Sequence, residues 1–219
     1  MEAKKLRVKG ILFDLDGTIM DSKEAYLEAL EAAFESGEQM ITDARTVTEI
    51  PKRLEQNLSI EDLIKGMDVH KFLKTYLSTY YRVTFEKAKP IPRVAETLEK
   101  LSKKAKLALI TMRYVPKENV IRELEKHGLA KHFQYVITAL DTENPKPSPE
   151  ALIKCAMQLN VEMCDCVVVG DSVADIRAGK NAGARTVGVF SGIFSRIELE
   201  KENPDLILEN VNKLPDFIE

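Results

Sequence analysis

The sequence predicts an α/β protein built on a parallel β-sheet. From residue 93 onward, segments with helical periodicity alternate with short apolar segments, and the connections between them are short. Such alternation is typical of a parallel sheet covered by helices on both faces. A further apolar segment, residues 9–13, lies far upstream and predicts the first strand of the same sheet.

The alternating part of the chain has clear start and stop signals. Gly128 and Gly183 follow the second and fourth predicted helices, and glycine is the usual residue just after a helix. The strands are short runs rich in valine, isoleucine and leucine. The predicted helices cover residues 93–103, 117–127, 149–159 and 174–181, and the predicted strands cover residues 107–111, 135–138, 166–169, 186–189 and 205–208.

The first predicted strand runs directly into a polar group of residues. Asp14 and Asp16 stand two positions apart, followed by Gly17 and Thr18. The carboxyl ends of strands are where open α/β sheets hold their chemistry, and alternation along a strand points both carboxylates to one side. Two carboxylates that close together repel, so they require a cation or a shared proton.

One connection is far longer than the others. About ninety residues separate the first strand from the second, whereas a crossover with its helix needs only a few tens. This segment has no convincing strand, and about sixty of its residues are surplus, enough for a small helical bundle over the carboxyl ends of the sheet. Helical periodicity covers residues 25–34, 42–56, 60–67 and 69–85, with Pro51 as a candidate break in the second.

Composition excludes several classes of protein. The 219 residues, 44% of them hydrophobic, suit one large domain or a core with a smaller companion, not a collagen, a coiled coil or a disordered chain. The net charge is −3, without a basic tail or arginine cluster, so we expect no nucleic-acid partner. No apolar run has the length of a membrane span and the amino terminus lacks the apolar core of a signal peptide. We therefore expect a cytoplasmic protein that binds no membrane, as a monomer or small homo-oligomer.

Polar side chains follow three further predicted strands. Thr111 ends the second strand, Lys146 lies in the loop after the third, and Asp171, Ser172 and Asp175 follow the fourth. Taken singly, a threonine at a strand end is usually a turn former, a lysine between prolines is usually solvated, and aspartates at a helix start often only cap it. Together, and in this order, they predict one site at the carboxyl edge of the sheet.

With these residues in place, the chain resembles the haloacid dehalogenase superfamily over residues 10–188, specifically its phosphatase-type, phosphoglycolate phosphatase-like and β-phosphoglucomutase-like members. The resemblance implies a Rossmann-like core of residues 1–20 and 90–219 and an inserted α-helical cap of residues 21–89. The family's four motifs are matched in order by Asp14, Asp16, Gly17 and Thr18; by Thr111; by Lys146; and by Asp171 with Asp175.

The resemblance implies a phosphatase that uses Mg²⁺ and forms a phosphoaspartate. Asp14 is the expected nucleophile and Asp16 the expected acid and base, a residue that suits phosphatases and phosphomutases rather than dehalogenases. Asp14, Asp171 and the backbone carbonyl of Asp16 are the expected metal ligands, while Ser172 and Asp175 orient them. Thr111 and Lys146 complete the catalytic set.

The expected phosphate- or substrate-binding residues are Gly17, Thr18, Thr111, Met112, Arg113 and Lys146. Many relatives have asparagine where this chain has Met112, and Arg113 either touches the substrate or points to solvent. Five cations of the predicted cap are candidates for binding a substrate anion, with a solvated helix face as the alternative: Arg45, Lys52, Arg53, Lys65 and Arg82.

Three functions are compatible with these residues. The first is a phosphatase that hydrolyses a small phosphorylated metabolite such as a phosphoglycolate-like or sugar-phosphate ester. The second is a sugar phosphomutase of the β-phosphoglucomutase type. The third is a non-catalytic binding module, against which the intact set of Asp14, Asp16, Lys146 and Asp171 argues. The sequence does not distinguish the first two, because that depends on residues of the cap.

Overall fold

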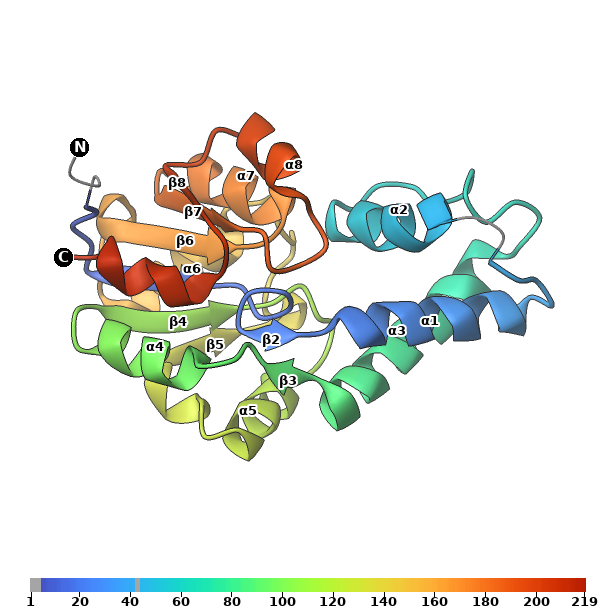
Figure 1. Cartoon of the computed structure of the whole chain (residues 1–219), viewed down its shortest axis with the longest axis horizontal. Coiled ribbons are helices and arrows are strands. Elements are labelled where there is room, and N and C mark those ends of the chain that lie inside the picture. Colours follow the sequence, from blue (N-terminus) through green and yellow to red (C-terminus); the bar gives the residue numbers. More distant parts are fainter. Residues whose placement is uncertain (1–4, 42–43) are drawn as a thin grey trace. The chain divides into compact units, whose positions relative to one another are not determined.

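The computed structural model describes residues 5–41 and 44–219. The chain divides into two compact units, one formed by Met1–Met20 with Pro90–Glu219 and the other by Asp21–Lys89. The first is an α/β unit and the second is helical (Figure 1). The assignment of the second unit as a cap stays a prediction.

The α/β unit contains a six-stranded sheet in the order β5-β4-β1-β6-β7-β8, and all of its strand pairs are parallel. The predicted α/β class is therefore confirmed. The first strand in the sequence lies in the middle of the sheet, where Ile11 pairs with Leu107 on one side and with Val167 on the other. The strands are β1 (Gly10–Phe13), β4 (Lys106–Ile110), β5 (Tyr135–Ile137), β6 (Cys166–Gly170), β7 (Arg185–Val189) and β8 (Leu206–Leu208).

Helices pack on this sheet through buried apolar side chains. The helix α6 packs against β1, β4 and β5, where Leu152 and Cys155 join Leu12 and Val168 in one apolar cluster. The helix α7 packs against β6 and β7. The helices of this unit are α4 (Val94–Ser102), α5 (Lys117–Lys126), α6 (Glu150–Leu159), α7 (Val173–Asn181) and α8 (Arg196–Lys201), with 3₁₀ turns at Ala130–His132, Ala139–Asp141, Met163–Asp165 and Val211–Asp216.

The helical unit contains α1 (Lys23–Ser36), α2 (Ala44–Glu55) and α3 (Val69–Lys87). Aromatic pairs join α1 to α3: the rings of Phe34 and Phe72 lie 5.3 Å apart, and those of Tyr26 and Tyr80 lie 4.9 Å apart. Such pairs add to the free energy gained from burial of the rings. Where this unit begins and ends in the chain, the short strands β2 (Met20–Asp21) and β3 (Lys89–Pro90) pair with each other.

The structure corrects three expectations about this segment. The helix expected at residues 60–67 is wrong, because the segment forms turns and Gly66 has a φ of +79°. Ile60 and Ile64 are both buried, so the two apolar residues four positions apart hold a turn against the rest of the unit and do not belong to a helix. Pro51 does not divide α2, which continues through it, although residues 42 and 43 of the expected helix lie outside the described residues. The two short strands were not expected.

Two of the five cap cations are held by carboxylates of the helical unit itself. Arg53 pairs with Asp62 and donates to the carbonyl of Ser59 at 3.1 Å, which fixes the turn after α2. Arg82 pairs with Glu86 one helical turn away at 2.9 Å. Exposed pairs of this kind contribute little stability. A role for any cap cation in substrate binding stays a prediction.

No helix within residues 5–41 and 44–219 combines the length and the apolar character needed to cross a bilayer. The cytoplasmic location expected from the sequence stays a prediction.

The α6 contact gives a test of the fold. Leu152 is fully buried, whereas the neighbouring Ile153 is 42% exposed. We expect Leu152→Ala to lower the free energy of unfolding by about 2–5 kcal/mol, because it removes buried methyl groups and leaves a cavity. Ile153→Ala, the matched control, should stay within about 1 kcal/mol of the parent. Urea unfolding followed by circular dichroism measures both, and equal losses would contradict the packing of Leu152 of α6 against the sheet.

Candidate active site

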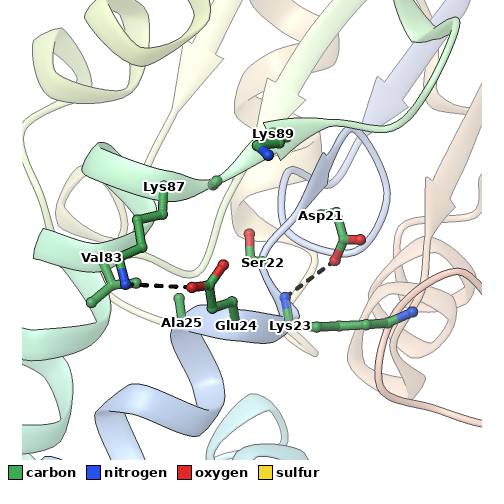
Figure 2. A pocket seen from close by; sticks show the side chains of 9 residues that line it. Asp21, Ser22, Lys23, Glu24, Ala25, Val83, Lys87 and Lys89 are labelled. Carbon is green, nitrogen blue, oxygen red and sulfur yellow. Dashed lines mark hydrogen bonds and ion pairs between the residues drawn. The ribbon is translucent and has the colours of Figure 1, made fainter.

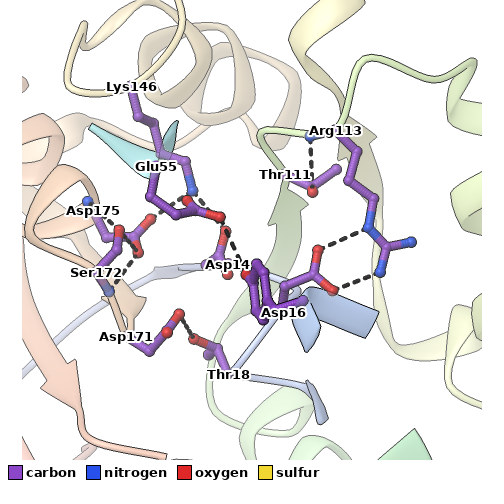
Figure 3. Close-up of polar contacts among 11 residues, drawn as sticks. Asp14, Asp16, Thr18, Glu55, Thr111, Arg113, Lys146, Asp171, Ser172 and Asp175 are labelled. Carbon is purple, nitrogen blue, oxygen red and sulfur yellow. Dashed lines mark hydrogen bonds and ion pairs between the residues drawn. The ribbon is translucent and has the colours of Figure 1, made fainter. Parts of the chain in front are cut away.

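The charged side chains that are buried in the described part of the chain lie near the carboxyl ends of the strands (Figure 3), except for Glu123, which comes from α5 and bonds to Arg113. Buried charges are rare and need partners, so their concentration in one place marks the candidate functional site. We call these residues the buried charge cluster: Asp14, Asp16, Arg113, Glu123, Lys146, Asp171 and Asp175.

Lys146 links two of the carboxylates. Its Nζ donates to Oδ1 of Asp14 and to Oδ1 of Asp175, each at 2.6 Å, and its side chain is 2% exposed. Burial alone would lower the pKa of Lys146, but the carboxylates of Asp14 and Asp175 outweigh it and raise the pKa above its usual value. The lysine is therefore held as a cation, and it is not the solvated residue that its neighbouring prolines would suggest.

The chain around Lys146 is fixed on both sides. The carboxylate of Glu150, at the start of α6, accepts from the backbone N–H groups of Glu143 and Asn144 at 3.1 and 3.0 Å. The side-chain amide of Asn181, in α7, donates to the carbonyl of Pro147 at 3.0 Å. These contacts tie the loop to two helices, so that Lys146 reaches the end of β1.

Asp14, Asp171 and Asp175 form the acidic side of the cluster. One carboxylate oxygen from each lies within 4.8 Å of the others. The backbone N–H of Asp14 donates to the carbonyl of Val169 at 2.9 Å, which places the residue at the end of β1 beside β6. Hard carboxylate oxygens grouped in this way are what Mg²⁺ prefers.

Two glycines leave space for the carboxylate of Asp171. A Cβ at Gly17, whose φ is +77°, would lie 2.5 Å from Oδ2 of Asp171, and one at Gly192 would lie 1.7 Å from the same oxygen. The hydroxyl of Thr18 donates to the other oxygen at 3.4 Å. Gly17 and Thr18, expected as phosphate-binding residues, therefore adjoin Asp171 in the structure, and their contact with phosphate stays a prediction.

Ser172 and Asp175 form a capping box at the start of α7. The Ser172 hydroxyl donates to Oδ2 of Asp175 at 2.6 Å, and the backbone N–H of Asp175 donates back to that hydroxyl at 3.2 Å. The second oxygen of Asp175 accepts from Lys146. Asp175 thus caps the helix and also lies beside the other acids, and its role in orienting metal ligands stays a prediction.

Arg113 does not point to solvent, so that one of the two alternatives is wrong, and its contact with substrate stays a prediction. Its Nε and Nη2 donate to the two oxygens of Asp16 at 2.7 and 2.6 Å, and its Nη1 donates to Glu123 at 2.5 Å (Figure 3 shows the Asp16 side). The side chain is 5% exposed. Burial raises the pKa of Glu123, and the positive charge of Arg113 opposes this shift.

Sequence reasoning missed Glu123. It comes from α5, where it shares the buried face with Val120 and Leu124. A carboxylate at a position of the helical pattern otherwise occupied by apolar residues is the signal that could have found it.

Thr111 lies at the end of β4, where its backbone N–H donates to the carbonyl of Ile137 at 3.1 Å. Its hydroxyl accepts from the backbone N–H of Arg113 at 3.3 Å (Figure 3), and Met112 between them is partly buried. Contact of Thr111 or Met112 with substrate stays a prediction.

A separate pocket of about 290 Å³ lies in the helical unit (Figure 2). Among its lining residues, Lys87 pairs with Glu24 at 3.4 Å and also with Glu28 of α1, and the backbone N–H of Lys23 donates to Asp21 at 3.2 Å. It contains none of the motif residues. The lining residues are Asp21, Ser22, Lys23, Glu24, Ala25, Val83, Lys87, Ala88 and Lys89.

The arrangement can be compared with known proteins. Residues 11–189 match the model of the haloacid dehalogenase-like hydrolases. The chain belongs to this family. The match includes every member of the buried charge cluster, and the resemblance inferred from the four motifs is confirmed.

This haloacid dehalogenase-like chain is similar, over nearly its whole length, to curated proteins and to proteins of solved structure. It is 28% identical to pyrophosphatase PpaX of Halalkalibacterium halodurans, over 97% of this chain and 98% of that protein. It is 30% identical to phosphoglycolate phosphatase of Shigella sonnei, over 94% of this chain and 91% of that protein. The structure of a putative β-phosphoglucomutase from Thermotoga maritima superposes with a TM-score of 0.68 at 27% identity, covering 95% of this chain and 97% of the other. Family and relatives together support an enzyme of the phosphatase type.

The contact of Gly192 with Asp171 gives a test of the acidic group. We expect Gly192→Ala to displace the Asp171 carboxylate and to raise the Mg²⁺ concentration for half-maximal thermal stabilisation by about 10- to 100-fold, the usual effect of disturbing groups around a metal ligand. The matched control is Gly188→Ala in β7, whose Cβ would meet its nearest neighbour at an ordinary 3.5 Å. An unchanged Mg²⁺ response in Gly192→Ala would show that Asp171 is not a ligand.

Proposed function

We propose that this chain is a Mg²⁺-dependent phosphatase that hydrolyses a small organic phosphate monoester through a phosphoaspartate on Asp14. The observation that carries the proposal is the buried charge cluster itself, with Asp14 at the end of the central strand and Lys146 held against it at 2.6 Å. A phosphate ester and a carboxylate nucleophile repel each other, so such a reaction needs fixed positive charge beside the nucleophile.

The residues present fit a divalent cation. The cluster contains five carboxylates but only two cationic side chains, and three of the carboxylates have oxygens within 4.8 Å of one another. Asp14, Asp171 and the backbone carbonyl of Asp16 would hold Mg²⁺. When bound, the ion supplies positive charge that lowers the repulsion between the nucleophile and the phosphate oxygens.

The residues of the chain can then divide the reaction into two steps. An oxygen of Asp14 attacks phosphorus, the bond from phosphorus to the ester oxygen breaks, and Asp16 gives a proton to the departing alkoxide. In the second step Asp16 takes a proton from water, whose oxygen attacks the phosphoaspartate and releases inorganic phosphate. Asp14 returns as a carboxylate, so atoms and protons balance over the cycle.

Lys146 supports both steps because its proton is retained. The two carboxylates that raise its pKa keep the ammonium group charged at neutral pH, so it can stabilise negative charge as it develops on the phosphoryl oxygens. Thr111 and the backbone near it would bind the same oxygens, with Gly17, Thr18 and Met112 around them.

The unit Asp21–Lys89 is the proposed cap, which excludes water from the reaction and selects the substrate.

The named relatives favour small substrates, since they are a phosphoglycolate phosphatase and a pyrophosphatase. The structural similarity to a putative β-phosphoglucomutase supports a second candidate, a sugar phosphomutase that shares the same first step. A purely binding function does not require the buried charge cluster.

The substrate is tested with a set of phosphate compounds, including phosphoglycolate, sugar phosphates and inorganic pyrophosphate, with Mg²⁺ present and phosphate release measured. The phosphatase proposal expects phosphate from at least one small ester. Conversion of a sugar 1-phosphate to its 6-phosphate isomer without phosphate release would support the phosphomutase instead.

Removal of metal gives a further prediction. We expect excess chelator to abolish phosphate release and added Mg²⁺ to restore it, because the carboxylates of the cluster would otherwise repel the substrate. Calcium should inhibit, since its larger and looser coordination would misplace Asp14. Full turnover in excess chelator would overturn the metal dependence.

Substitutions of the two neighbouring aspartates should have different effects on the reaction. We expect Asp14→Asn to abolish phosphoryl transfer, because the nucleophile is lost. Asp16→Asn should slow turnover by about a hundred- to ten-thousand-fold and should accumulate phosphate on Asp14 when an aryl phosphate, which needs little protonation, is the substrate. Intact-protein mass after a rapid acid quench measures the added phosphoryl group.

The double variant is the control for that experiment and should carry no phosphoryl group. A phosphoryl group found on Thr18 or Ser172, or ordinary turnover by Asp14→Asn, would refute Asp14 as the nucleophile.

A further inference from the structure

We propose that Glu123 is a positioning residue that acts through Arg113 to hold the carboxylate of Asp16 in place for proton transfer. This inference rests on the proposed role of Asp16 as acid and base. Glu123 and Asp16 both accept hydrogen bonds from Arg113, so the arginine is the contact through which Glu123 can position that carboxylate.

The guanidinium of Arg113 bridges the two carboxylates. Its Nε and Nη2 donate to the two oxygens of Asp16 at 2.7 and 2.6 Å. On the other side, Nη1 donates to Oε2 of Glu123 at 2.5 Å, and Nη2 approaches Oε1 at 3.4 Å. Paired bonds from a planar guanidinium restrict both the distance and the orientation of a carboxylate, which a single contact does not.

The far end of this bridge is rigid. Glu123 belongs to α5, whose residues Val120 and Leu124 are fully buried on either side of it. Asp16, in contrast, lies after the end of β1 in the turn that leads to Met20, and Arg113 lies in the segment after β4. Glu123 therefore anchors two residues outside regular secondary structure to a packed helix.

Burial makes the anchor necessary. The side chains of Arg113 and Glu123 are only 5% and 3% exposed, so water offers them little compensation for a lost partner. Arg113 remains protonated and cannot itself supply the proton for the leaving group. Its contribution is to keep the oxygens of Asp16 where a leaving oxygen can reach them, and a misplacement of about 1 Å can cost about 100-fold in rate.

The test compares two substrates in Glu123→Gln, which keeps the shape of the side chain but removes its charge. The ratio kcat/KM reports the steps up to the phosphoaspartate, and only a poor leaving group needs a well-placed acid there. We expect kcat/KM to fall by about 10- to 100-fold for an alkyl phosphate but by less than about threefold for an aryl phosphate. Glu125→Gln, an exposed residue of the same helix, is the matched control and should match the parent with both substrates.

A double-mutant cycle shows whether the effect passes through Asp16. In an Asp16→Asn background, Glu123→Gln should add less than about a twofold change in kcat/KM for the alkyl phosphate, because the group that it positions is already lost. Full additivity of the two effects would overturn the inference, as would an equal loss for alkyl and aryl phosphates in Glu123→Gln.

Failure of the inference is separable from failure of the proposed function. If Asp16→Asn alone slows alkyl and aryl phosphates equally, the acid role of Asp16 is wrong and the inference fails with it. If Asp16→Asn discriminates between them and Glu123→Gln does not, only the inference fails. Arg113→Lys, which keeps the charge but loses the planar pair of bonds, is the second variant should Glu123→Gln not fold, and it should show the same preference for the aryl phosphate.

Discussion

The structure depends on a group of buried charged side chains of a kind that is rare in folded proteins. Five carboxylates and two cationic side chains are buried together, and the described part of the chain buries no other charged residue. Lys146, between Asp14 and Asp175, joins segments from three regions of the sequence at 2.6 Å. Replacing such groups with apolar residues often stabilises a protein, so their retention is better explained by chemistry than by stability.

The parallel sheet explains why these residues can meet. Each of the strands β1, β4 and β6 is followed directly by a polar residue of the site, and parallel pairing brings those ends to the same edge. At two positions near these strand ends, the site also requires a residue without a side chain. Gly17 and Gly192 are required because any side chain there would occupy the space of the Asp171 carboxylate.

The sequence was sufficient to predict the sheet, its strands and the residues at the strand ends, because apolar runs and the polar residues that follow them are local signals. It was not sufficient for Arg113, whose partners Asp16 and Glu123 lie 97 and 10 positions away and are brought to it only by the fold. The expected helix at residues 60–67 failed for a related reason. Two isoleucines four positions apart satisfy a helical pattern, but a turn that buries both satisfies it equally well.

The pairing of β2 with β3 has a consequence for how the chain is assembled. The segment Asp21–Lys89 leaves the α/β unit and returns to it through strands that are adjacent to each other. An insertion whose two ends are neighbours places little demand on the length or shape of what lies between them. A different segment with closely spaced ends could therefore occupy the same point without changing the register of β1 against β4 and β6. Under the proposed role of this segment in substrate selection, exchange of one continuous insert would change substrate preference and leave the buried charge cluster unchanged.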